Sequence, residues 1–160
     1  MTKEIKRNAW SKFCRKFSSD NQFRWMKINM IDRTKNESRF AGDFPFIGLS
    51  LEKKGRLIDG LQLVAGWTDP DRVSRPILSI KDPATVMLEQ EKDGTTTALK
   101  VMTRDGSEAM IHLMGARDPN WFVEKLAYSL YERRGYEHGN DMGDWFEAEK
   151  KVRQAETVFV

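Results

Sequence analysis

The sequence of 160 residues contains little cysteine and little histidine: one cysteine, Cys14, and two histidines. A single cysteine excludes a disulfide framework within the chain, and so few cysteines and histidines exclude a zinc cluster built from these residue types. We therefore expect no bound metal. The lone thiol is typical of a reducing compartment, so we expect a cytoplasmic protein. A chain of this length can bury about two-thirds of its unfolded surface and can fold without such cross-links.

Long hydrophobic runs are missing as well. No stretch reaches the roughly 18 apolar residues of a membrane-spanning helix, so we expect no membrane span. The first residues contain no apolar run of the length that a secretory signal has, so we expect no export by that route. Charged residues make up 32% and hydrophobic residues 39% of the chain, and the net charge is only +3. This composition is typical of a globular protein rather than a disordered one.

The motifs that define common enzyme classes are also absent. The sequence has no Gly-x-Ser-x-Gly nucleophile elbow, no phosphate-binding loop and no Gly-x-Gly-x-x-Gly segment. Asp69 and Asp71 flank Pro70 close to Trp67, which is typical of an ordinary turn and, as an alternative, of a sugar or cation contact. We expect a protein that is not an enzyme and holds no cofactor.

Residues 5–18 predict an amphipathic helix. Apolar side chains recur there at the i, i+3, i+4, i+7 spacing that places them on one face of a helix. This apolar stripe consists of Trp10, Phe13, Cys14 and Phe17.

Residues 22–114 predict about seven β-strands. Apolar and polar residues alternate there with a period of two, as in Met26, Ile28 and Met30, which is typical of strands with one buried face. Glycine-bearing segments at 53–55, 92–94 and 104–106 predict short hairpin connections, and these make neighbouring strands antiparallel. Such a series without intervening helices indicates an antiparallel, curled sheet that resembles a barrel or a sandwich.

Residues 118–156 predict an antiparallel helical hairpin. Asp118 is a suitable N-cap with Pro119 at the first helical position, and Gly135 is a natural C-terminal stop. Because two short helices gain most of their stability from packing, we expect the hairpin to pack on the sheet.

The fold class is therefore α+β: an N-terminal helix, a curled antiparallel sheet and a C-terminal helical hairpin. We divide the chain into residues 1–115, which hold the helix and the sheet, and residues 116–160, which hold the hairpin, and expect them to form one structural unit. The residues expected in the core are Trp10, Phe13, Phe17, Ile28, Leu49, Leu63, Ile80, Leu99, Ile111, Leu126 and Trp145.

Two parts of the chain resemble known families. Residues 5–114 resemble a small bacterial domain family of unknown function whose members open with a tryptophan-bearing helix and continue as antiparallel strands. That resemblance rests on Trp10, Phe13, Phe17-Ser18, Trp25, Phe46-Ile47-Gly48-Leu49, Ile80, Pro83 and Asp105-Gly106. Residues 118–156 resemble a second family of unknown function, through Ala127-Tyr128, Tyr131, Gly135, Gly139, Asp144-Trp145 and Ala148-Glu149. The resemblances imply a bacterial origin and the fold above, but no activity, cofactor or catalytic residue.

Positive charge is concentrated at the N-terminus. Residues 1–30 contain eight basic and two acidic residues, a local charge of +6, whereas the other 130 residues carry a charge of −3. A basic helix can contact phosphates, so one hypothesis is nucleic-acid binding through Lys12, Arg15, Lys16 and Arg24. The alternative is that these side chains form a solvated helix face.

Aromatic residues are plentiful, with five tryptophans and nine phenylalanines. These rings either fill the core or leave an exposed aromatic patch, which marks a partner site. We expect a non-enzymatic protein-interaction module that binds another protein or a second copy of itself, with Trp67, Trp121 and Tyr136 as the possible surface. The alternatives are nucleic-acid binding and the binding of a small ligand inside the curled sheet.

Overall fold

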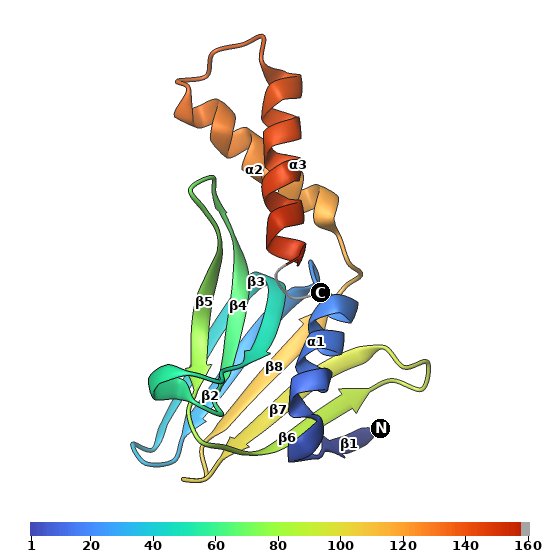
Figure 1. The fold of residues 1–160 in the computed structure, drawn as a ribbon, viewed down its shortest axis with the longest axis vertical. Coiled ribbons are helices and arrows are strands. Elements are labelled where there is room, and N and C mark those ends of the chain that lie inside the picture. The colour runs from blue at the N-terminus through green and yellow to red at the C-terminus, as the bar shows by residue number, and fades with distance from the viewer. Residues whose placement is uncertain (158–160) are drawn as a thin grey trace.

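The computed structural model describes residues 1–157, apart from the side chains of Leu57 and Thr157. It contains an N-terminal helix, an open antiparallel sheet of eight strands and two C-terminal helices, which confirms the α+β class (Figure 1). The strands are β1 (Thr2–Ile5), β2 (Trp25–Asp32), β3 (Glu37–Leu51), β4 (Leu61–Asp69), β5 (Arg72–Ile80), β6 (Pro83–Gln90), β7 (Thr96–Thr103) and β8 (Glu108–Met114). Their order in the sheet is β1-β6-β7-β8-β2-β3-β4-β5.

Three local predictions differ from the structure. The sheet has one strand more than predicted, because the polar segment Thr2–Ile5 pairs with β6 as an exposed edge strand. The first helix, α1, spans Trp10–Asn21 and follows a short 3₁₀ helix, η1 (Arg7–Ala9), so it begins later than residue 5. Residues 52–60 join β3 to β4 through a second 3₁₀ helix, η2 (Gly55–Leu57), instead of the short turn predicted at 53–55.

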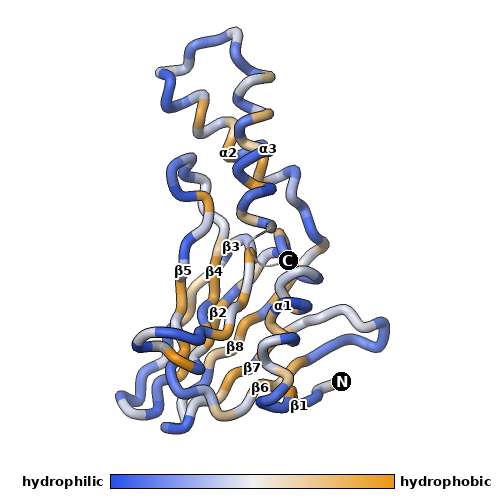
Figure 2. The backbone as a smooth tube through the Cα atoms, in the orientation of Figure 1, coloured by the Kyte–Doolittle hydropathy of each residue, from blue (hydrophilic) through white to orange (hydrophobic). Residues whose placement is uncertain are grey.

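The sheet curls around α1, and the main core lies between them. Trp10, Cys14 and Phe17 of α1 are buried against side chains from both ends of the strand order. Ser18 also ties the helix to β3, since the backbone N–H of Leu49 donates to Ser18 Oγ at 2.8 Å. Figure 2 shows hydrophobic segments along the strands and hydrophilic ones in the connecting loops. The side chains of α1 pack against the face of the curled sheet where the small-ligand alternative would place its ligand.

The C-terminal helices, α2 (Pro119–Arg133) and α3 (Asp141–Thr157), stand at one end of the long axis of the molecule (Figure 1). Asp118 caps α2, because its Oδ1 accepts from the backbone N–H of Trp121 at 3.1 Å, and Gly135 has the positive φ of a helix stop. A second buried cluster joins both helices to the outer face of β3 and β4. Its members are Phe23, Ile47, Val64, Phe122, Val123, Leu126, Leu130, Ala148 and Val152.

Nine of the eleven expected core residues are buried, but two predictions need correction. Phe13 is only partly buried at the margin of the main core. Trp145 remains 37% exposed and is not a core residue. It lies at the flank of the buried stripe of α3, and its indole N–H donates to Glu149 Oε2 on the next turn.

Candidate functional site

Arg24, predicted as a contact to nucleic acid, lies inside the protein with only 7% of its surface exposed. Its Nε donates to the carbonyl oxygen of Gly115 at 2.7 Å. Its Nη1 donates to Asn21 Oδ1 and to the carbonyl oxygen of Thr96, both at 2.8 Å. Burial lowers the pKa of this guanidinium, and the charge of Glu91 acts in the opposite direction. Arg24 therefore connects α1, β7 and the end of β8, and it also lines a surface groove of about 890 Å³ between these elements.

The three other predicted nucleic-acid contacts are exposed on α1. Lys12 and Arg15 face solvent, and Lys16 forms an ion pair with Asp20 in which Nζ and Oδ2 are 2.7 Å apart. The structure thus brings Lys12, Arg15 and Lys16 together and separates them from Arg24.

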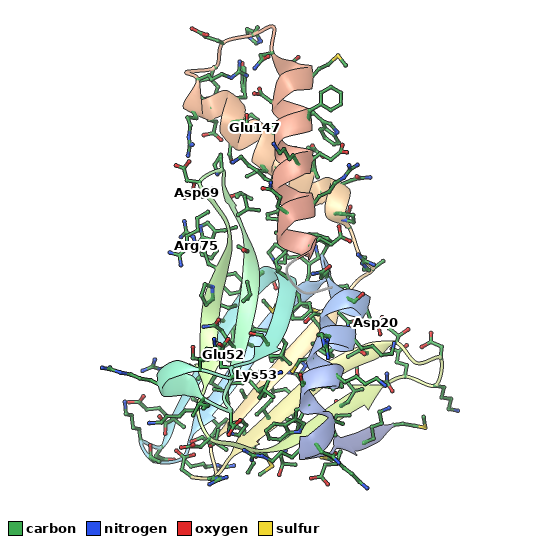
Figure 3. The ribbon with its side chains drawn as sticks, viewed as in Figure 1. Asp20, Glu52, Lys53, Asp69, Arg75 and Glu147 are labelled. Carbon is green, nitrogen blue, oxygen red and sulfur yellow. The ribbon has the colours of Figure 1, made fainter. Side chains whose placement is uncertain are left out.

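The Asp69-Pro70-Asp71 segment forms a turn that fastens the β4–β5 hairpin to α2. The Arg133 guanidinium binds both carboxylate oxygens of Asp71 at 2.9 Å and lies 3.4 Å from Asp69 Oδ1. Hydrogen bonding to Arg133 lowers the pKa of Asp71. Asp69 also accepts from Arg75 at 3.0 Å (both labelled in Figure 3). These acids have partners within the chain, which supports their interpretation as a structural turn.

The three residues predicted as an interaction surface have different environments. Trp67 is half-buried, stacks on Phe44 and lies under the Arg75 guanidinium, which is 4.5 Å from its ring centroid. Trp121 is half-buried and packs edge-on against Trp25 at 4.6 Å between ring centroids. Tyr136 is exposed and contacts the ring of Tyr131 near the end of the hairpin. Two of the three are thus largely engaged within the fold.

The largest concentration of exposed hydrophobic side chains lies on the helical hairpin. Among the side chains that the structure describes, nine large hydrophobic ones are exposed, and five of these belong to the hairpin. We call these five residues the hairpin surface: Tyr128, Tyr136, Met142, Trp145 and Phe146. Met142 and Phe146 are 72% and 61% exposed. The sequence contains the signal for this surface, because Met142, Trp145 and Phe146 follow the i, i+3, i+4 spacing of one helix side.

A groove of about 410 Å³ lies between α2 and α3 beside this surface. We call it the hairpin groove. Its aromatic walls are Tyr128 and Tyr131 from α2, His138 from the connecting loop and Trp145 from α3. The hydroxyl of Tyr131 lies 3.4 Å from His138 Nε2, and the rings of Tyr128 and Tyr131 are 6.0 Å apart.

The hairpin groove carries an excess of negative charge. Its lining includes Glu124, Asp141 and Asp144 but only one formal cation, Lys125. Asp144 forms an ion pair with Arg134, and Lys125 is directed to the ring of Trp121, with Nζ 5.9 Å from its centroid. Within residues 1–157, Glu124 and Asp141 have no ion-pair partner. The two carboxylates are therefore available to a cation.

Metal binding, membrane spanning and catalysis by a cysteine nucleophile find little support in the described part of the chain. Within residues 1–157, no group of three or more histidine, cysteine or acidic side chains is arranged to hold a metal ion. None of the described helices is both long enough and apolar enough to span a membrane. Burial raises the pKa of the Cys14 thiol to about 12, so Cys14 stays protonated at physiological pH and is a poor nucleophile.

One family match accompanies these observations. Residues 123–154 match the family described as "Protein of unknown function (DUF2934)", which agrees with the resemblance of residues 118–156 to a family of unknown function. The matched segment contains most of α2 and α3 and every residue that lines the hairpin groove. No curated protein and no solved structure matches the chain. The resemblance of residues 5–114 to a small bacterial domain family stays a prediction.

Proposed function

We propose that this protein is a non-enzymatic module that binds a basic segment of a partner protein in the hairpin groove. One observation carries this function: aromatic rings from both helices line this groove together with two carboxylates that have no ion-pair partner among the described residues. The single cysteine supports a cytoplasmic location, and both family resemblances support a bacterial origin.

The chemistry of the hairpin groove fits an arginine or lysine side chain. A cation placed over the face of a tyrosine or tryptophan ring gains about 0.5–2 kcal/mol, depending on how far it is desolvated. A guanidinium can also donate to a carboxylate in a charge-assisted hydrogen bond. Tyr128 of α2 and Trp145 of α3 offer the rings, while Glu124 and Asp141 offer the charge.

The hairpin surface supplies an apolar contact next to the groove. Met142 and Phe146 lie on the exposed side of α3, and nothing within residues 1–157 covers them. Adjacent exposed hydrophobic side chains of this size are typical of protein interfaces. A partner segment that combines a cation with a neighbouring apolar residue would contact both parts.

Peptide selection tests this function. Random twelve-residue peptides displayed on phage are selected against the immobilised full chain. We expect the enriched peptides to carry arginine or lysine beside an apolar residue. Enrichment of acidic peptides, or no enrichment, would contradict the proposal.

Variants then locate the binding site. In the double variant Tyr128→Ala/Trp145→Ala, the loss of two cation–ring contacts is expected to weaken binding of an enriched peptide about tenfold, since about 1.4 kcal/mol corresponds to that factor. Phe40→Ala is the matched control, because Phe40 is an exposed aromatic residue on β3, outside the hairpin. Equal losses in the two variants would show that the groove is not the site.

A further inference from the structure

A second charged feature lies on α1 and the β3–β4 connection, and none of its lining residues belongs to the hairpin. Figure 3 shows Lys53 and Glu52 at the foot of β3 and β4, far from Glu147 on α3. Two adjoining surface grooves of about 440 Å³ and 500 Å³ lie here and share Gln62. We call them together the basic groove. Its cations are Arg15 on α1, Lys53, Lys54 and Arg56 in the β3–β4 connection, and Lys81 after β5.

The positive charge of the basic groove is not balanced within the described part of the chain. None of its five cations forms an ion pair there, although neighbouring basic residues do: Arg7 lies 3.8 Å from Asp59, and Lys16 lies 2.7 Å from Asp20. The one acidic side chain in the lining, Glu52, accepts a hydrogen bond from Ser50 at 3.0 Å. The lining therefore carries a net charge of +4. Because gathered like charges repel each other, they weaken the fold unless an anion binds.

The neutral groups of the basic groove fit phosphate oxygens. Serine hydroxyls and the side-chain amide of Gln62 line both grooves, and such groups, with arginine and lysine, make most protein contacts to nucleic-acid phosphates. None of the side chains that line them is aromatic. Stacking on aromatic rings is the usual way to hold single strands, so this lining favours a duplex, whose bases are already stacked.

We propose that the basic groove binds the phosphodiester backbone of double-stranded nucleic acid through charge and with little sequence preference. A recessed groove fits a ridge of phosphates better than a flat membrane surface. This site differs from the one predicted from sequence: of those four residues only Arg15 belongs to it, and Arg24 is buried elsewhere. It is also independent of the partner site on the hairpin.

Binding of a fluorescein-labelled 20-base-pair DNA duplex, followed by anisotropy, tests the proposal on the full chain. With a net charge of +4 and a logarithmic slope of about −0.9 per neutralised phosphate, the affinity is expected to fall about 100-fold between about 50 and 200 mM salt. The double variant Lys53→Glu/Lys81→Glu is expected to bind at least about tenfold more weakly at the lower salt concentration and to show a shallower slope.

The matched control is Lys3→Glu/Lys92→Glu, which changes the net charge equally. Lys3 lies on the opposite edge strand, β1, and Lys92 lies in the exposed β6–β7 connection. We expect this variant to keep its affinity within about twofold, because no phosphate contact is lost. Circular dichroism verifies that both variants are folded.

Three results would overturn the proposal. The first is an equal affinity and an equal salt slope for the two double variants. The second is tighter binding of a 20-nucleotide single strand than of the duplex. The third is binding to vesicles that contain phosphatidylserine without binding to the duplex, which would assign the basic groove to an anionic membrane surface.

Discussion

Replacing Phe122 by alanine is expected to lower the free energy of unfolding by about 3–5 kcal/mol. Phe122 is fully buried at the contact between α2 and the sheet, where its ring packs 6.2 Å from that of Phe23. A Cβ built on Gly66 would lie only 3.0 Å from Phe122 Cζ, which shows how closely β4 approaches the ring. Truncation leaves a cavity that the rigid sheet cannot close. Chemical denaturation followed by tryptophan fluorescence measures the loss.

Tyr128→Ala is the matched control for this experiment. Tyr128 lies on the same helix but is 54% exposed, so its truncation is expected to change the stability by no more than about 1 kcal/mol. A loss of less than about 1 kcal/mol for Phe122→Ala would mean that the second buried cluster does not hold the hairpin on the sheet.

Arg24→Ala is expected to lower the free energy of unfolding by about 3–5 kcal/mol, because buried hydrogen-bond acceptors lose a charged donor. The carbonyl oxygen of Thr96 and Asn21 Oδ1, both buried, would be left without it, each at a penalty of about 1–3 kcal/mol. Arg24→Lys should recover little of this loss, since an ammonium group lacks the planar fork that reaches all three acceptors. Thermal or urea unfolding of the two variants provides the measurement.

The control for this prediction is Arg15→Ala on the exposed side of α1, where a change within about 0.5 kcal/mol is expected. If Arg24→Ala were as stable as Arg15→Ala, the assignment of Arg24 as a connection between α1, β7 and β8 would be wrong. The same comparison separates the structural role of Arg24 from the nucleic-acid contact that its sequence position suggested.

The sequence predicts an element well where the local pattern of apolar and polar residues matches the face that is buried in the structure. The strands of the sheet carry a period of two because one face packs on α1, as for Leu49, Leu63 and Ile111. Asp118 and Gly135 mark the ends of α2 because a cap and a positive φ are local requirements. Such signals require no knowledge of distant contacts.

The structure differs from the prediction where contacts between residues far apart in the sequence determine the conformation or the burial of a residue. The polar segment of β1 becomes a strand because β6 leaves an unpaired edge beside it. Trp145 shares the helical spacing of a core residue, yet neither the sheet nor α2 fully covers it. The sequence shows that Arg24 is charged, but it does not show whether the guanidinium faces solvent or binds carbonyl oxygens. Its acceptors in Thr96 and Gly115 lie far along the chain.

The candidate sites were only partly visible in the sequence for the same reason. An aromatic surplus predicted an exposed patch, but it could not select Tyr128 and Trp145 over Trp67 and Trp121, since neighbours on other elements determine exposure. The N-terminal excess of positive charge pointed to α1. The basic groove also needs Lys53, which the fold places beside Arg15 of α1, and Lys81, which the β4–β5 pairing places beside the β3–β4 connection.

The most direct test of the hairpin groove is a titration of the ¹⁵N-labelled full chain with N-acetyl-arginine methylamide, followed by NMR. The Trp145 indole N–H signal is the reporter, and N-acetyl-citrulline methylamide, which has nearly the same shape without the charge, is the control. We predict that the arginine compound shifts this signal progressively, while the buried Trp10 indole signal stays in place and the citrulline compound has little effect. Equal shifts from both compounds, or a Trp145 signal that does not move, would contradict a cation site in the hairpin groove.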